Sequence, residues 1–184
     1  MLDIKKTAID GVLLITPKRF SDARGFFVET YNAERFRAAG IAEIFVQDNH
    51  SQSLAAGTVR GLHYQAPPRA QAKLVRVLKG AIVDVAVDAR KMSPTYGRHV
   101  RATLSADNGA QLLVPAGFLH GFATLEPDTH VAYKVSDFYS AEHDGAVFWN
   151  DPALGIDWGI DPANAVLSNK DAKAEPFSRF NSPF

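Results

Sequence analysis

Apolar and polar residues alternate along most of the chain with a period of two, which is the spacing of side chains on the two faces of a β-strand. Turn-forming residues such as Asp107-Asn108-Gly109 and Pro115-Ala116-Gly117 separate the apolar runs. Many short strands joined by close turns are typical of a β-sandwich or β-barrel. We expect strands at residues 12–15, 25–31, 44–49, 58–65, 73–78, 81–87, 99–104, 111–114, 120–125 and 129–136.

One stretch, residues 32–39, has the pattern of a helix instead. Asn32 can accept a hydrogen bond from the first turn, and Gly40 stands where a helix commonly ends in a left-handed residue. From Asp151 onward the chain is rich in Pro, Asp and Asn, so we expect turns and a short helix that wrap the β core. No linker composition divides the chain, which predicts one domain over residues 1–184.

Several ionisable side chains fall on the apolar face of their predicted strands. Lys73 alternates with Val75 and Val77, and Tyr133 with Val131 and Val135. A single such residue is more often at an edge, with its polar end reaching water. Similar placements on different strands favour a pocket inside the β structure, which holds one ligand. The full set of expected inward groups is Lys73, Tyr133, His63 (with Val59, Gly61 and Gln65), His120 (with Phe122) and Glu29 (with Phe27 and Tyr31).

Composition excludes several classes of function. The 184 residues include 20 basic and 20 acidic side chains, so no net charge attracts a nucleic acid or an anionic membrane. The chain has no cysteine, which excludes disulfides, thiolate metal ligands and a thiol nucleophile. Neither a bilayer-spanning apolar run nor a signal-peptide core is visible, so we expect a cytoplasmic protein without nucleic-acid or membrane partners.

The segment from Gly109 to His120 resembles the second cupin motif, with glycine, proline, glycine and histidine at that motif's spacing. The first cupin motif requires two histidines one residue apart and then a glutamate. Here His63 fits, but Gln65 takes the second histidine position and Arg69 stands near the glutamate position. A catalytic metal generally needs at least three protein ligands. We therefore expect a cupin-type protein with no metal and no cofactor, against the alternative of a metal-dependent cupin oxygenase.

Three further stretches make the resemblance specific: Asp22 to Glu29, Val59 to Gln65, and Tyr133 to Tyr139. Together with Trp149-Asn-Asp-Pro and Leu167-Ser-Asn-Lys-Asp, they are similar to the dTDP-4-dehydrorhamnose 3,5-epimerase family over nearly the whole chain. The resemblance implies an all-β, cupin-type β barrel (jelly roll) with a few short helices. It also implies a homodimer with exchanged N-terminal strands and a dTDP-sugar substrate in the L-rhamnose pathway.

The resemblance also implies roles for individual residues. His63 is the expected general base, Asp171 orients its imidazole, Tyr133 is the general acid, and Lys73 lies near the C4 oxygen of the sugar. Arg24 and Glu29 are expected to reach the partner subunit's site. The substrate-binding positions are Arg24, Glu29, Gln47, Asn49, Arg60, Lys73, His120, Asp144 and Lys170. At position 144 the family usually has glutamate, so the shorter Asp144 predicts a contact made through water.

The chemistry of a 4-ketosugar explains why these residue types are needed. Hydrogens on C3 and C5 are acidic only because their carbanions delocalise onto the C4 oxygen, so a base must act together with a cation near that oxygen. Inversion also requires a proton from the opposite face of the ring, which a tyrosine can donate at pH 7. A mono-epimerase acting at C3 or C5 alone has the same residues, and a sugar-binding cupin without catalysis is a further alternative.

Overall fold

A computed structural model describes residues 2–184, which form β-strands, two short α-helices and two 3-10 turns. The strands are β1 (Leu2–Lys6), β2 (Leu13–Pro17), β3 (Arg19–Asp22), β4 (Gly25–Val28), β5 (Gln47–Ser53), β6 (Val59–Gln65), β7 (Lys73–Lys79), β8 (Ala81–Asp88), β9 (His99–Ser105), β10 (Gln111–Val114), β11 (Phe118–Thr124), β12 (Thr129–Val135) and β13 (Asp144–Ala146). The helical segments are α1 (Ala33–Ala38), η1 (Pro162–Asn164), α2 (Asn169–Ala172) and η2 (Phe177–Arg179).

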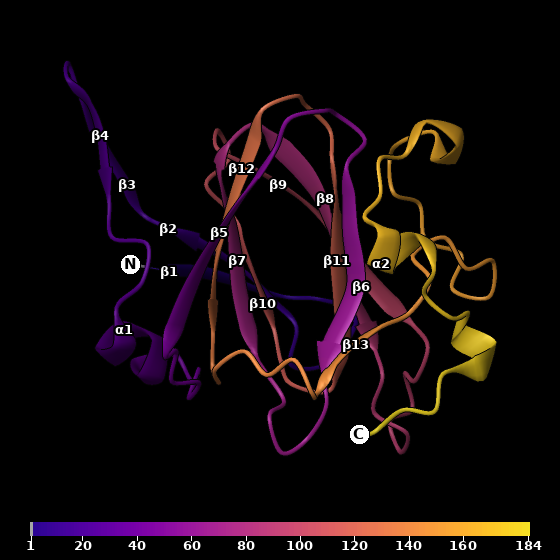
Figure 1. Cartoon of the computed structure of the whole chain (residues 1–184). Coiled ribbons are helices and arrows are strands. Elements are labelled where there is room, and N and C mark those ends of the chain that lie inside the picture. The colour runs from indigo at the N-terminus through magenta and orange to yellow at the C-terminus, as the bar shows by residue number, and fades with distance from the viewer. Residues whose placement is uncertain (1) are drawn as a thin grey trace.

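Two antiparallel sheets face each other and form the body of the molecule (Figure 1). One has the strand order β1-β2-β10-β7-β12-β5, and the other has the order β13-β6-β11-β8-β9. The all-β jelly-roll prediction is confirmed. Among residues 2–184 no ladder joins the two sheets into a closed ring, so the structure is a jelly-roll sandwich and not a closed barrel.

Apolar side chains fill one part of the space between the sheets. Val75 and Val77 of one sheet pack with Ile82, Ala86 and other aliphatic residues of the facing strands. Burying each such side chain contributes about 1.5–3 kcal/mol, so this cluster holds the two sheets together. The chain after β13 covers the outer face of the five-stranded sheet, as Figure 1 shows in yellow. Two tryptophans anchor it, with the Trp158 indole N–H donating to the Trp149 carbonyl at 3.0 Å.

The helix prediction for residues 32–39 is confirmed. The Asn32 side chain accepts a hydrogen bond from the Arg35 backbone N–H at 3.1 Å, and Gly40 adopts the left-handed region with φ of +85°. Phe36, the buried residue of α1, packs edge-to-face against Tyr31. This packing explains why the expected strand 25–31 ends at Val28, because Tyr31 lies against the helix and not in a ladder.

Other boundaries also differ from those expected. The strand expected at residues 44–49 lies at Gln47–Ser53, since Phe45 belongs to the aromatic cluster around α1. Three strands were not expected from the sequence: β1, β3 and β13. Each is five residues or shorter, and two of them, β1 and β13, lie at sheet edges, where alternation is a weak signal.

Strand β6 breaks the expected alternation at Gly61. The β6–β11 register shifts between the pairs His120–His63 and Phe122–Arg60. A Cβ atom on Gly61, whose φ is +134°, would lie 2.6 Å from the Gly121 Cα atom, so only glycine fits there. As a result Arg60 and His63 both face the interior. The expectation that Val59 shares the face of His63 is wrong, because Val59 packs with the outer cluster under the C-terminal segment.

The hairpin of β3 and β4 projects from the body of the molecule, at the upper left of Figure 1. Three of its aromatic side chains are exposed: Phe20 (52%), Phe26 (58%) and Phe27 (70%). Glu29, just after β4, forms an ion pair with Arg35 of α1 at 2.9 Å. The expectation that Glu29 points into the same chain's β structure is therefore wrong, because the strand ends before it.

Candidate active site

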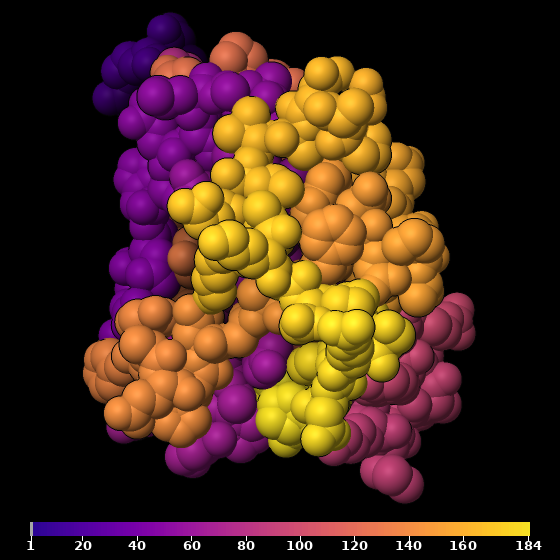
Figure 2. Space-filling model, turned by 45° about the vertical axis from the view of Figure 1, so that its right-hand side comes forward, coloured from indigo at the N-terminus to yellow at the C-terminus, as the bar shows by residue number. Residues whose placement is uncertain are grey.

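A hollow between the two sheets collects most of the predicted site residues. It has two adjoining parts, of about 360 Å³ and 260 Å³. Both parts are lined by His63, Lys73, Tyr133 and Lys170. The larger part is also lined by Ser51, Thr58, Arg60, His120, Phe122 and Asp171, and the smaller by Gln47, Asn49, Gln65, Gln71, Tyr139 and Asp144. The C-terminal segment contributes Lys170 and Asp171 to the lining. Figure 2 shows this segment in yellow, running over the surface beside the preceding segment in orange.

His63 and Asp171 form a tight pair on the wall made by the five-stranded sheet. The His63 Nε2 atom lies 2.5 Å from Asp171 Oδ1, and the side chains are 30% and 3% exposed. Asp171 lies in α2, which begins after the capping residue Ser168. Burial alone would raise the Asp171 pKa, but hydrogen bonds from His63, Ser168 and the Gly61 backbone hold that pKa below its usual value. The carboxylate thus accepts from Nε2–H and leaves Nδ1 of His63 as the basic atom.

A second histidine–aspartate pair lies deeper in the same wall. The His120 Nε2 atom is 2.7 Å from Asp84 Oδ1, and these side chains are 7% and 0% exposed. Burial lowers the pKa of His120, against the attraction of Asp84. Sequence analysis missed Asp84 as a site residue. The signal was present, because Asp84 alternates with Ile82 and Ala86 in the same way that Lys73 alternates with valines.

Lys73 and Tyr133 occupy the opposite wall, on the adjacent strands β7 and β12. Burial lowers the pKa of Lys73 from 10.5 to about 8, although attraction by Asp84 and Asp144 opposes this change. Burial raises the pKa of Tyr133, with Arg60 acting in the other direction. At neutral pH Lys73 is therefore mostly a cation and Tyr133 is a phenol, so this wall offers two proton donors.

Further polar groups of the hollow are held by hydrogen bonds and ion pairs. Arg60, in the larger part, donates to the Gln52 carbonyl at 2.9 Å. Lys170, which lines both parts, has its Nζ atom 2.5 Å from Asp144 Oδ2. Gln47 donates to Asn49 at 2.9 Å from β5, and its own Oε1 accepts from the Tyr139 backbone N–H at 3.0 Å.

Arg24 and Glu29 are the two predicted site residues that do not line this hollow. Arg24 lies at the tip of the projecting hairpin, where its guanidinium pairs with Asp22 at 2.6 Å. This pairing raises the Arg24 pKa. Both residues lie on the side of the chain that carries the exposed phenylalanines, away from the hollow.

The residues at the expected cupin ligand positions serve other purposes. The Gln65 side chain donates to the Phe138 carbonyl at 2.9 Å and accepts from the Ser140 backbone N–H at 2.8 Å, so it braces a loop. His120 is engaged by Asp84. Within residues 2–184, no group of three or more His, Asp or Glu side chains is placed to hold a metal ion. The donor set around the hollow thus fits proton transfer better than metal binding.

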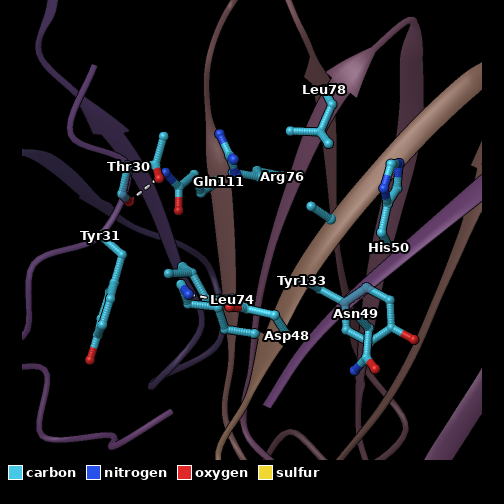
Figure 3. A pocket seen from close by; sticks show the side chains of 12 residues that line it. Thr30, Tyr31, Asp48, Asn49, His50, Leu74, Arg76, Leu78, Gln111 and Tyr133 are labelled. Carbon is cyan, nitrogen blue, oxygen red and sulfur yellow. Dashed lines mark hydrogen bonds and ion pairs between the residues drawn. The ribbon is translucent and has the colours of Figure 1, made fainter. Parts of the chain in front are cut away.

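A second hollow, of about 270 Å³, lies on the outer face of the six-stranded sheet (Figure 3). Arg76 and Gln111 are paired across β7 and β10 there, and Gln111 donates to the Thr30 carbonyl at 2.9 Å. An apolar and aromatic part of the lining comes from Leu74, Leu78, Tyr31 and His50. Asn49 and Tyr133, which also line the first hollow, border this one as well, but neither histidine–aspartate pair does. Separately, none of the helices in residues 2–184 is long and apolar enough to cross a membrane.

Comparison with known proteins identifies the family. The profile of the dTDP-4-dehydrorhamnose 3,5-epimerase family matches residues 6–179. A protein of that name from Sinorhizobium fredii is 54% identical over 90% of this chain and 84% of its own length. The crystal structure of the Legionella pneumophila dTDP-6-deoxy-D-glucose-3,5-epimerase in complex with dTDP-4-keto-L-rhamnose is 43% identical, with a TM-score of 0.94 over 98% of this chain and 95% of that one.

A protein with narrower action is also similar, at a lower level. The 3'-monoepimerase from Streptomyces bikiniensis, solved with dTDP-quinovose, is 33% identical, with a TM-score of 0.87 over 94% of this chain and 86% of that one. The similarity to 3,5-epimerases is the stronger of the two in sequence and in structure. This chain belongs to the dTDP-4-dehydrorhamnose 3,5-epimerase family, whose members are isomerases.

Proposed function

We propose that this protein inverts C3 and C5 of dTDP-4-keto-6-deoxy-D-glucose to give dTDP-4-keto-L-rhamnose, a step of dTDP-L-rhamnose biosynthesis. One observation carries the proposal. A histidine base, His63, and a tyrosine donor, Tyr133, stand on opposite walls of one hollow, on β6 and β12. Inversion requires that the proton leave one face of the ring and return on the other. A sugar held between the walls meets the base on one face and the acid on the other.

The proton transfers balance as follows. Nδ1 of His63 takes the proton from C3, the electron pair moves into an enolate on C3, C4 and the C4 oxygen, and Asp171 stabilises the imidazolium. Tyr133 then gives its phenolic proton to C3 from the other side, and the enolate returns to a ketone. Solvent removes the proton from His63 and restores the one on Tyr133. The same two groups act at C5 after the ring shifts between them.

Lys73 stabilises the enolate. The C4 oxygen gains negative charge in the transition state, and an ammonium group in a site that excludes water stabilises that charge far more than bulk water does. Lys73 lies one strand away from Tyr133 and lines both parts of the hollow. This position allows Lys73 to donate to an oxygen midway between C3 and C5.

The remaining polar groups bind the nucleotide and the sugar hydroxyls. Arg60 and Lys170, which both line the larger part of the hollow, supply positive charge for the diphosphate. Gln47 and Asn49 offer amide groups for the base, beside the exposed ring of Tyr139. The Asp144 carboxylate is paired with Lys170, so it positions that cation and meets the ligand through water. His120 contacts the sugar from the deeper wall.

The protein is proposed to be a homodimer in which the N-terminal hairpin reaches the neighbouring subunit. Phe26 and Phe27 are more than half exposed, and covering such a ring contributes about 1.5–3 kcal/mol. Thr30 and Tyr31, which follow the hairpin, border the outer hollow of Figure 3, and the Leu74 and Leu78 side chains there offer apolar surface to a second copy. Arg24 and Glu29 would then complete the partner's binding site.

Light scattering and ligand titration test this assembly. Replacing both Phe26 and Phe27 by serine should weaken dimerisation and dTDP binding together, because the hairpin would no longer dock. Replacing the exposed Met92, which lies far from the hairpin in sequence, by serine is the matched control and should change neither quantity. A monomer with full activity would contradict the proposed exchange.

The cytoplasmic location stays a prediction from the sequence.

The reaction is tested by incubating the protein with dTDP-4-keto-6-deoxy-D-glucose in D₂O and recording NMR spectra. We expect deuterium at both C3 and C5 of the product. Deuterium at only one carbon would favour a mono-epimerase, like the similar protein from Streptomyces bikiniensis. No deuterium at either carbon would reject the proposed activity on this substrate.

A further inference from the structure

Asp84 is the least expected residue in the interior of this protein. It lies in the middle of β8, whose eight residues are all buried, and it is 0% exposed. On its face of the strand the neighbours are Ile82 and Ala86, which belong to the apolar cluster between the sheets. An aliphatic side chain would pack there without cost. A buried carboxylate is costly unless its charge and both oxygens are compensated.

That compensation is incomplete. Asp84 Oδ1 lies 2.7 Å from His120 Nε2, but Oδ2 has no hydrogen-bond partner and is shielded from solvent. Within residues 2–184 the other buried side-chain polar atom without a partner is Ser51 Oγ. Ser51 lines the hollow directly, so a bound sugar can satisfy it. Asp84 lies behind His120 and does not line the hollow, so its unpaired oxygen needs a different explanation.

Asp84 acts on two groups that line the hollow. His120, on the same wall, contacts it directly, and Lys73 lies on the facing wall. Asp84 attracts both of them, and it is the largest source of attraction acting on the Lys73 ammonium. We propose that Asp84 is a positioning residue for the reaction: its carboxylate holds the His120 ring with the proton on Nε2, and its buried negative charge attracts Lys73 on the facing wall. This inference rests on the proposed function of the site.

With Asp84 in this role, His120 and Lys73 present different hydrogen-bonding groups to the sugar. With its Nε2–H donated to Asp84, a neutral His120 presents Nδ1 as an acceptor, which receives a hydrogen bond from a sugar hydroxyl and not from the ketone. Lys73, kept as an ammonium by the nearby carboxylate, is then the donor to the C4 oxygen. A hydroxyl and a ketone are thus distinguished by an acceptor on one wall and a donor on the other. Asp84 thus determines the acceptor on His120 and the donor on Lys73 without itself touching the substrate.

The strand supplies a matched control. Asp88, four residues along β8 on the same face, is also 0% exposed, but both of its oxygens are occupied. Its partners are Arg90, Ser93 and Thr95, none of which lines either part of the hollow. Asp88→Asn removes one buried charge from the same strand. It therefore reports the effect on folding alone.

The test compares Asp84→Asn with Asp88→Asn by kcat, KM, pH profile and thermal unfolding. For Asp84→Asn we expect kcat to fall by about 10- to 100-fold with KM changed much less, as for other residues that act through a contacting group. The basic limb of the pH profile should also move to lower pH. Asp88→Asn should lower the unfolding temperature without moving that limb. A folded Asp84→Asn variant within twofold of the parent kcat and with the same limb would overturn the proposal.

A second measurement covers the case in which Asp84→Asn does not fold. Nitrogen-15 NMR of the unaltered protein, with His120 assigned by His120→Gln, reads the tautomer directly. We expect a neutral ring with the proton on Nε2, and a proton on Nδ1 would overturn the proposal. Because this readout needs no turnover, an inactive parent protein would reject the proposed reaction while leaving the tautomer result to decide the role of Asp84.

Discussion

The two histidine–aspartate pairs of the site have the same atoms in contact and different surroundings. His63 is 30% exposed to the hollow, and its aspartate comes from a short helix in the C-terminal segment. His120 is 7% exposed, and its aspartate comes from the adjacent strand of the same sheet. An imidazole that exchanges protons must reach both substrate and solvent, whereas one that only orients a ligand can be sealed. The difference favours proton transfer as the role of His63 and orientation of the substrate as the role of His120.

The largest expected effect follows from removing the exposed histidine. His63→Asn eliminates proton abstraction at both carbons, so turnover should fall by roughly 10²–10⁴-fold or more. The matched variant His120→Asn should lose less activity and should still exchange protons at C3 and C5. Steady-state rates and deuterium exchange measured on both folded variants decide the comparison. Similar residual exchange in the two variants would contradict the division of roles.

The next effect concerns the carboxylate behind the base. Asp171→Asn keeps the shape of the side chain but removes the charge that stabilises the imidazolium, so we expect kcat to fall about 10- to 100-fold. Deuterium exchange at C3 and C5 should slow together with turnover, because Asp171 acts on the proton-abstraction step through its contact with His63. Exchange at the parent rate would show that Asp171 does not act through His63.

The pKa of Lys73 predicts where activity declines at high pH, that is, the basic limb of kcat/KM plotted against pH. Its pKa is lowered to about 8 by burial, so the ammonium is present below that pH and is lost as the pH rises through it. Activity should therefore decline above about pH 8, whereas Tyr133 keeps its proton because its pKa is raised. Lys73→Arg should remove this limb, because a guanidinium stays charged, even if its rate is lower. A parent protein with constant activity from pH 8 to pH 10 would exclude a required Lys73 ammonium.

The smallest expected effect is that of chelation. Gln65 braces a loop and His120 is held by Asp84, so these positions are not available as ligands of a catalytic ion. Activity after dialysis against EDTA should equal that before it. A tightly bound ion in elemental analysis, with activity lost on its removal and restored on its return, would overturn this expectation.

Sequence patterns predicted the parts of the structure that depend on local chemistry. Alternation located the long strands and put Lys73, Tyr133 and His120 on their correct faces, because a strand with one apolar face has little choice of register. The Asn32 cap and Gly40 located α1 for the same reason. The pairing of Asp171 with His63 came from family resemblance, since residues 108 positions apart leave no local signal.

Other features depend on contacts that alternation cannot report. The register shift at Gly61 puts Arg60 and His63 on one face, because the chain passes close to the Gly121 backbone. Glu29 was assigned to a strand that ends one residue earlier, where packing of Tyr31 on Phe36 redirects the chain. Asp84 followed the same inward pattern as Lys73, but its importance is visible only from its contact with His120 and its unpaired oxygen.

The central claim is that base and acid act from opposite walls, and Tyr133→Phe tests it most directly. The ring and its packing remain, and only the phenolic proton is lost. We predict that the folded variant, incubated with dTDP-4-keto-6-deoxy-D-glucose in D₂O, exchanges substrate hydrogens for deuterium through His63 but forms little inverted product. Inversion at the parent rate would contradict the account, because another group or water would then protonate the face assigned to Tyr133.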